Sequence, residues 1–198
     1  RTEAIQAAIF GVIMFQDMLS FFGVLAIILG TIGVIFITVF EGGFGFRNLY
    51  QKFLSKSAMI GIGSGFCFAI SGVTIRHASL SLQYDNFLIS AAFTLCVIVF
   101  MQMILMFGYL LIRRRDELLR IFKFWKLPLL VGITSILGSI GWFTAMTLQN
   151  AAYVKIIGQV EIIFALLISY KIFDEELLKK EALGILLIMT SVILLVFA

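Results

Sequence analysis

Residues 86–112 read NFLISAAFTLCVIVFMQMILMFGYLLI, a stretch without a single charged side chain. A helix that crosses the hydrocarbon core of a bilayer needs about 20 consecutive apolar residues, and this stretch is longer than that. Its apolar residues form a continuous run, whereas in a strand of a membrane barrel they would alternate with polar ones. The stretch therefore predicts a transmembrane α-helix, and it decides the fold class of the chain.

The composition of the chain agrees with a location in the membrane. Of its 198 residues, 62% are hydrophobic and 13% are charged. A soluble domain is about half apolar and about a quarter charged, so this chain has too few charges to cover a surface that faces water. Nucleic-acid binding would need a basic face on a soluble scaffold, and the sequence predicts no such face.

Five further stretches are apolar enough to span a bilayer, and short polar connections separate them. The predicted spans are residues 21–40, 58–75, 86–112, 127–148, 151–172 and 182–198, and a shorter apolar stretch, residues 4–15, precedes them. We therefore predict an all-α fold, a polytopic bundle of transmembrane helices.

The beginning of the chain is repeated at its end. Residues 1–40 align with residues 159–198 without a gap, at an offset of 158. Apolar identities are frequent between any two membrane helices, but this alignment also places Glu3 opposite Glu161 and Asp17 opposite Glu175. Five predicted helices separate the two copies, and an odd number inverts the second copy in the membrane. Inverted repeats are typical of secondary transporters, whose substrate sites lie where the repeats meet.

The same alignment predicts where the domains begin and end. Arg1 lies opposite Gln159, which is in the middle of the predicted span 151–172, so we expect the first helix to lack its first half. The chain would then be truncated at its N-terminus. Residues 1–40 would form the end of a first repeat, residues 41–56 a connecting loop and residues 57–198 a second repeat.

Residues 149–161 read QNAAYVKIIGQVE, and FALL at 164–167, an acid at Glu175 and Gly184 within an apolar run follow them. This pattern resembles the end of an EamA domain, from the drug/metabolite transporter superfamily, and residues 2–34 resemble the end of the preceding repeat. The resemblance implies the last seven of ten helices in an alternating-access carrier of small metabolites. It also implies a central cavity and no need for ATP.

Two orientations in the membrane stay open. Basic residues gather between residues 113 and 126 and again at Arg47, Lys52 and Lys56. The positive-inside rule places both groups in the cytoplasm and Ala198 outside, whereas the resemblance implies that Ala198 lies inside. The short loops fit a bacterial inner membrane, where lipid would surround the chain.

Two acids within apolar segments are the first candidates for a functional site. A charge at the centre of a bilayer costs about 2.5–3.5 kcal/mol on insertion scales, so it usually faces the protein interior and has a function. Glu161 lies midway along its span, and Glu3 is its counterpart in the first copy. We predict that they couple transport to a proton or bind a cation; the alternative is a structural hydrogen bond between the repeats.

Polar side chains near these acids complete the predicted site. Lys155 and Gln159 are four residues apart, so they share a helix face and could hold a carboxylate-bearing substrate, unless Lys155 extends to the membrane surface. Tyr153 fits an interfacial aromatic belt, and Trp142 fits a cavity wall. The predicted substrate- or ion-binding residues are Glu3, Gln6, Trp142, Asn150, Tyr153, Lys155, Gln159 and Glu161.

The sequence gives little support for catalysis. It has one histidine, and Cys67 and Cys96 lie in separate apolar runs, so we expect no metal site and no cofactor, and we expect both thiols to be buried. The predicted function is secondary-active transport of a small solute, such as an amino acid or a nucleoside. A non-transporting membrane scaffold or assembly protein is the alternative, and a membrane enzyme acting on lipid is a third possibility. The oligomeric state is not predicted.

Overall fold

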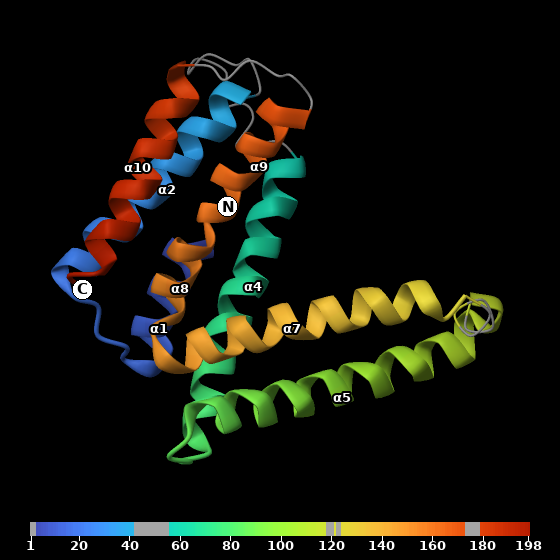
Figure 1. The fold of residues 1–198 in the computed structure, drawn as a ribbon. Coiled ribbons are helices and arrows are strands. Elements are labelled where there is room, and N and C mark those ends of the chain that lie inside the picture. Colours follow the sequence, from blue (N-terminus) through green and yellow to red (C-terminus); the bar gives the residue numbers. More distant parts are fainter. Residues whose placement is uncertain (1–2, 42–55, 118–120, 122–123, 173–178) are drawn as a thin grey trace. The chain divides into compact units, whose positions relative to one another are not determined.

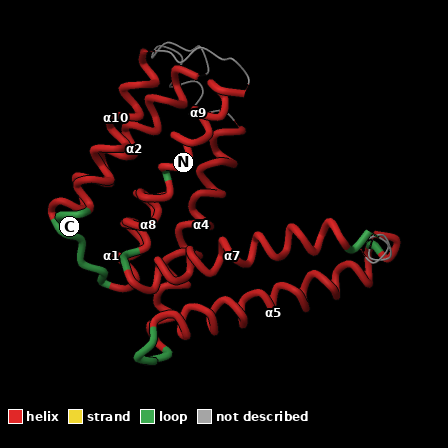
Figure 2. The backbone as a smooth tube through the Cα atoms, in the orientation of Figure 1, coloured by secondary structure: helices red, strands yellow, loops and turns green. Residues whose placement is uncertain are grey.

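The computed structural model describes residues 3–41, 56–117, 121, 124–172 and 179–198. Within these ranges the chain consists of helices joined by short turns and contains no strand (Figure 2). The predicted all-α fold class is therefore confirmed.

The helices follow the predicted spans closely (Figure 1). Three single helices, α4, α5 and α7, and the segment Ala151–Ile172 are long and apolar enough to cross a membrane. The helices are α1 (Glu3–Phe15), α2 (Phe21–Glu41), α4 (Lys56–Ser81), α5 (Phe87–Arg113), α7 (Lys126–Leu148), α8 (Ala151–Gly158), α9 (Val160–Ile172) and α10 (Lys179–Leu195).

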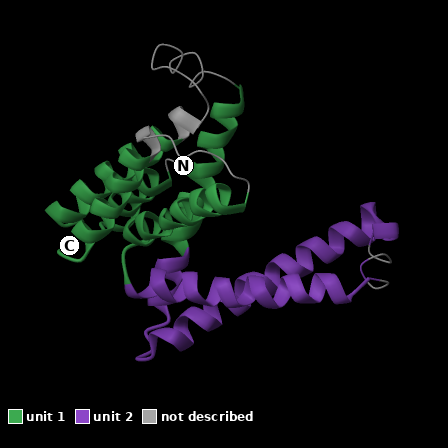
Figure 3. Cartoon of the chain, turned by 45° about the horizontal axis from the view of Figure 1, so that its top comes forward, with its two compact units in different colours: residues 1–74, 149–198 green, residues 75–148 purple. Residues whose placement is uncertain are grey.

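The chain forms two compact units (Figure 3). Unit 1 comprises residues 1–74 and 149–198, and unit 2 comprises residues 75–148. These units are defined by packing, so they do not test the predicted repeat boundaries at residues 40 and 56.

Helices α2 and α10 lie side by side in unit 1 and run antiparallel (Figure 1). A Cβ atom at Gly33 would lie 2.9 Å from the carbonyl oxygen of Gly184, and one at Gly184 would lie 2.8 Å from the carbonyl oxygen of Gly33. The two backbones therefore touch at this point, as small residues allow within a membrane. Val34, Ile37 and Ile188 are buried beside the contact.

Helices α1 and α8 form the second packed pair of unit 1. Their interface is made largely of alanines, which let the two backbones approach closely. The buried cluster comprises Ala4, Ala7 and Ala8 from α1, Ile27 from α2, Ala69 and Val73 from α4, and Ala151, Ala152, Tyr153 and Ile156 from α8. This close packing brings the polar residues of α1 and α8 together.

The predicted span 151–172 is present as one membrane-length segment, and its helix tightens at a single residue. Helix α8 ends at Gly158 and α9 begins at Val160, so Gln159 lies between two helices. The N–H of Gln159 donates to the carbonyl of Ile156 at 3.0 Å, and the carbonyl of Gln159 accepts from Ile162 at 3.0 Å. Both bonds span three residues where an α-helix spans four. Sequence hydropathy does not detect such a break, because the segment stays apolar throughout.

Unit 2 contains the end of α4 together with α5 and α7. Arg76 donates from Nη1 to the carbonyls of Met146 and Thr147 at 3.0 and 3.4 Å, and the hydroxyls of Ser79 and Thr147 lie 2.8 Å apart. These bonds join α4 to the C-terminal end of α7. Over the rest of their length α5 and α7 expose large apolar side chains, as lipid-facing helices do.

The two cysteines correct one prediction. Cys67 on α4 and Cys96 on α5 are exposed and form no disulfide, whereas the sequence led us to expect buried thiols. Both lie within helices long and apolar enough to cross a membrane, and a free thiol behaves as a small apolar group. In a lipid-facing helix, an apolar neighbourhood in the sequence therefore does not imply burial inside the protein.

Candidate functional site

An ion pair joins the two packed helices α1 and α8 of unit 1. The Nζ atom of Lys155 lies 2.9 Å from Oε2 of Glu3, and the side chains are 15% and 34% exposed. Glu3 lies in the first turn of α1, and Lys155 lies in the last turn of α8. Two opposite charges therefore neutralise each other within an apolar bundle.

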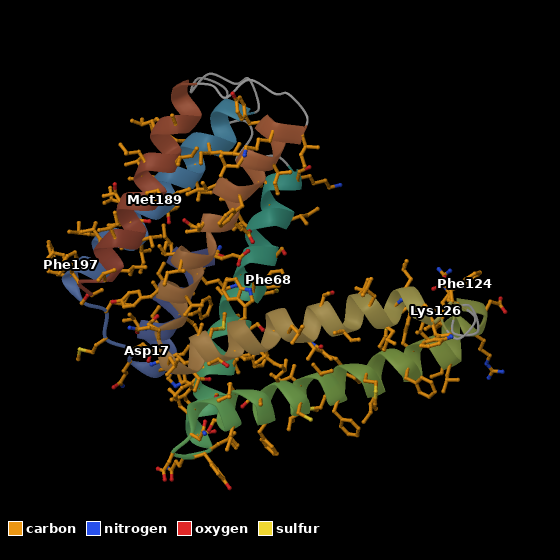
Figure 4. All side chains as sticks on the ribbon, viewed as in Figure 1. Asp17, Phe68, Phe124, Lys126, Met189 and Phe197 are labelled. Atoms are coloured by element: carbon orange, nitrogen blue, oxygen red, sulfur yellow. The ribbon has the colours of Figure 1, made fainter. Side chains whose placement is uncertain are left out.

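An aromatic ring from α4 lies beneath the cation. The Nζ atom of Lys155 is 5.5 Å from the ring centroid of Phe68, within the range of a cation–π interaction. Phe68 itself is exposed on α4 (Figure 4). Lys155 thus has both a carboxylate and an aromatic face as neighbours.

Gln6 lies one turn after Glu3 on α1. Its Nε2 atom donates to the carbonyl of Ile62 on α4 at 3.4 Å. Its Oε1 atom is buried and has no hydrogen-bond partner in the described part of the chain. An unsatisfied buried acceptor is costly, so this oxygen is a polar atom that favours a hydrogen-bond donor beside it.

Gln159 places a second such oxygen at the junction of α2, α8 and α10. Its Oε1 atom is buried, has no partner among the described residues, and lies 3.2 Å from the position of a Cβ atom on Gly30. The hydroxyl oxygen of Ser191 lies 2.9 Å from the same position. The break between α8 and α9 thus places a polar atom within the packed interface of unit 1.

Two other predicted site residues have structural contacts. The hydroxyl of Tyr153 is buried and accepts a hydrogen bond from the backbone N–H of Ser20 at 3.0 Å. The Oδ1 atom of Asn150 accepts from the N–H of Ala152 at 2.9 Å and caps the start of α8, as asparagine commonly does. These contacts hold α8, the helix that carries Lys155, and a direct role in binding stays a prediction.

Glu161 and Trp142 are the remaining two predicted residues. Glu161 is exposed in the first turn of α9, and no bond joins it to Glu3 within the described ranges. Trp142 belongs to α7 in unit 2 and is partly exposed. The structure thus brings together Glu3, Gln6 and Lys155, while a functional role of Glu161 and Trp142 stays a prediction.

Sequence reasoning missed the partner of each charge. It paired Glu3 with Glu161 through the repeat, but the structure pairs Glu3 with Lys155. The available signal was that an acid and a lysine inside apolar helices usually find each other. Phe68 carried no signal, because phenylalanine is common throughout this sequence. No group of acidic, histidine or cysteine residues that could hold a metal ion occurs among the described residues.

The profile of the EamA-like transporter family matches residues 55–197, which is more than half of the chain. The chain belongs to the EamA-like transporter family. No curated protein and no solved structure matches it.

Family membership makes this EamA-like chain an integral membrane protein of the drug/metabolite transporter superfamily. The matched residues run from the start of α4 to the end of α10 and include Lys155 and Phe68. Glu3 and Gln6 precede the matched range, and the structure packs them against it through α1. The membrane, transport and EamA expectations from the sequence are therefore confirmed.

Proposed function

We propose that this EamA-like chain acts as a secondary-active carrier of a small polar metabolite, an amino acid or a nucleoside-like solute, and works by alternating access. We place it in a bacterial inner membrane. The ion pair between Lys155 and Glu3 is the observation that carries the proposal. It lies between α1 and α8, helices that otherwise pack through alanines.

Stability alone does not account for this pair. Replacing a buried ion pair by apolar residues of similar volume is often neutral or stabilises a protein by about 1–4 kcal/mol. A membrane scaffold could therefore join α1 to α8 with apolar residues alone. A charged pair of which both members are still partly accessible favours a site that a solute can enter.

The break between α8 and α9 supports a moving element beside this site. Carriers place discontinuous helices at their substrate sites, and a tightened turn within a helix often marks a hinge. Lys155 lies on α8, one turn before the break at Gln159. We propose that the angle between α8 and α9 changes at Gln159 when the carrier switches between its outward-open and inward-open states.

We further propose that Glu161, in the first turn of α9, couples transport to a proton or another cation. The carboxylate is exposed and lies directly after the break, so its protonation would act on the element that moves.

Flux measurements test these proposals. The full-length protein would be purified, placed in liposomes and offered labelled amino acids and nucleosides, with and without a proton gradient. We expect at least one solute to enter faster than into empty liposomes, and faster still with the gradient. Glu161→Gln should abolish the effect of the gradient, whereas Glu117→Gln, an exposed acid on the other unit, should not.

Each outcome bears on a different part of the proposal. A protein that moves none of the solutes would favour the membrane scaffold. A Glu161→Gln variant that responds to the gradient like the wild type would remove Glu161 from coupling but leave the carrier function in place.

A further inference from the structure

Unit 2 carries an excess of positive charge at one end of the hairpin that α5 and α7 form (Figure 1). Residues 113–126 run from the end of α5 to the start of α7, and in the sequence they include six basic and two acidic residues, so their net charge is +4. The formal net charge of the whole chain is also +4. The rest of the chain is therefore balanced, and the excess lies at this one end.

We call the described basic residues of this segment the basic cluster. All of them are exposed, and they are Arg113, Arg114, Arg115 and Lys126. The Nη1 atom of Arg114 lies 3.2 Å from Oε1 of Glu117, and both side chains are more than half exposed. Such an exposed pair contributes little free energy, so another anion can replace Glu117. No carboxylate is bonded to the other three members within the described ranges.

Arg115 is held at the end of α5. Its Nε atom donates to the carbonyl of Leu111 at 2.8 Å. Leu111 belongs to the last turn of α5, whose carbonyls lack partners within the helix. This bond keeps the guanidinium group at the helix end and leaves the N–H groups on its Nη atoms for another acceptor. The planar fork of an arginine matches the oxygens of a phosphate group.

The lengths of α5 and α7 bring the basic cluster to the surface of the membrane. The two helices have 27 and 23 residues, so at about 1.5 Å per residue they are about 40 and 35 Å long. Because the hydrocarbon core is about 30 Å thick, their ends reach the headgroup layer. Phe124 and Trp125 are exposed directly before Lys126 (Figure 4), and tryptophan is frequent at this depth.

The opposite end of the hairpin carries no such excess. Asp85 is the only charged residue between α4 and α5, and residues 149–150, which follow α7, are uncharged. Arg76 lies at this end, but its Nη1 atom donates to two carbonyls at the C-terminal end of α7. Its charge therefore offsets the negative end of the α7 dipole. The two ends of the hairpin thus differ strongly in charge.

We propose that the basic cluster binds the phosphate groups of anionic phospholipids. Phosphate is the anion present at the depth that the cluster reaches, and in an anionic lipid no cation of the same headgroup cancels its charge. Each lysine or arginine close to an anionic membrane strengthens binding by roughly fivefold. The exposed rings of Phe124 and Trp125 favour a lipid over a soluble acidic partner. This inference does not depend on the proposed transport function.

Native mass spectrometry of the full-length protein in a neutral detergent tests the proposal. The probes are dioleoylphosphatidylglycerol, which is anionic, and dioleoylphosphatidylcholine, which is zwitterionic, in equal amounts. We expect the wild type to retain phosphatidylglycerol at least about fivefold more often than phosphatidylcholine. Inorganic phosphate in excess distinguishes a lipid headgroup from a free anion, and it should not release the bound phosphatidylglycerol, because it has no acyl chains to hold it at this surface.

Two matched variants locate the binding. Arg113→Gln/Lys126→Gln removes two exposed charges from the basic cluster and should lower the preference for phosphatidylglycerol at least about fivefold. The control is Lys56→Gln/Lys171→Gln, which removes two exposed charges at the start of α4 and in the last turn of α9 and should keep the preference of the wild type. If Arg113→Gln/Lys126→Gln does not fold, Lys126→Gln alone decides.

Four results would overturn the proposal. Equal retention of both lipids by the wild type would leave a soluble acidic partner for the basic cluster. Release of phosphatidylglycerol by inorganic phosphate would indicate a site for free anions. A wild-type preference in Arg113→Gln/Lys126→Gln would place the binding elsewhere on the protein. An equal loss of preference in this variant and in the control would show that the overall charge of the chain selects the lipid.

Discussion

Gly23 packs against Tyr153 so closely that only glycine, which has no Cβ atom, fits there. A Cβ atom there would overlap the hydroxyl and ring atoms of Tyr153, which is buried and bonded to Ser20. Because Tyr153 lies on α8, two residues before Lys155, this one glycine helps to set the position of the lysine. The position of a charged residue in this bundle thus depends on a glycine that has no side chain.

Gly23→Ala should therefore destabilise the protein. An added methyl group in a packed interface costs about 1–3 kcal/mol, and the overlap with Tyr153 leaves it no room. Thermal unfolding in detergent measures the effect. Gly63→Ala is the control, because a Cβ atom at Gly63 meets nothing within 4 Å and alanine favours a helix by up to about 1 kcal/mol over glycine. Equal melting temperatures for the two variants would contradict the packing of Tyr153 on Gly23.

Among the helices, α2 and α10 are counterparts in the predicted inverted repeat, and they pack against each other. Gly33 contacts Gly184, and a Cβ atom at Gly30 would contact Ser191. Residue numbers therefore rise along α2 as they fall along α10, so the two helices are antiparallel. The two helices are the counterparts of each other in the predicted repeat, since Phe21 and Lys179, their first residues, are 158 residues apart. Antiparallel packing is the arrangement that inverted copies require.

A disulfide tests this pairing directly. The hydroxyl oxygen of Ser191 lies 2.9 Å from the Cβ position of Gly30, and disulfides form where Cβ atoms lie about 3.8 Å apart. In a protein with Cys67→Ser and Cys96→Ser, the pair Gly30→Cys/Ser191→Cys should therefore oxidise and lose its reaction with maleimide.

The control pair Gly63→Cys/Ser191→Cys should keep its free thiols, because no side chain lies near Gly63. Peptide mapping by mass spectrometry would identify the linked residues. If Gly30→Cys/Ser191→Cys stayed reduced under oxidising conditions, the register of α2 on α10 would be wrong.

In the molecule as a whole, many large apolar side chains are exposed, as a protein surrounded by lipid requires. Only 6% of the membrane window of α5 is buried inside the protein, and Phe100, near its middle, is 56% exposed. In water such a surface would cause aggregation, but in hydrocarbon it is the surface that the solvent requires.

Phe100→Arg should consequently reduce insertion of the protein into the membrane. An arginine at the centre of a span costs about 2.5–3.5 kcal/mol, and neither α5 nor α7 contains an acidic residue that could pair with it. The amount of protein in carbonate-washed membranes measures the effect. Tyr84→Arg places the same charge at an exposed turn and should insert like the wild type, so equal amounts of both variants would contradict a lipid-facing α5.

That the chain is helical and spans a membrane can be read from its apolar segments, and the resemblance to the EamA family can be read from its motifs. Residues 86–112 suffice for the first conclusion, because the length and hydropathy of a span are local properties that need no partner. Glu3, Lys155, Gln6 and Gln159 were likewise recognised as candidates because polar side chains are rare in apolar segments.

Which of these residues meet depends on how the helices pack. Glu3 and Lys155 are far apart in the chain. The alanine packing of α1 on α8 and the close contact of Gly23 with Tyr153 bring them together. The break at Gln159 and the exposure of Cys67 were decided in the same way. Close packing depends on the shapes of the two helix surfaces that meet. The hydropathy of one helix carries no information about the helix that packs against it.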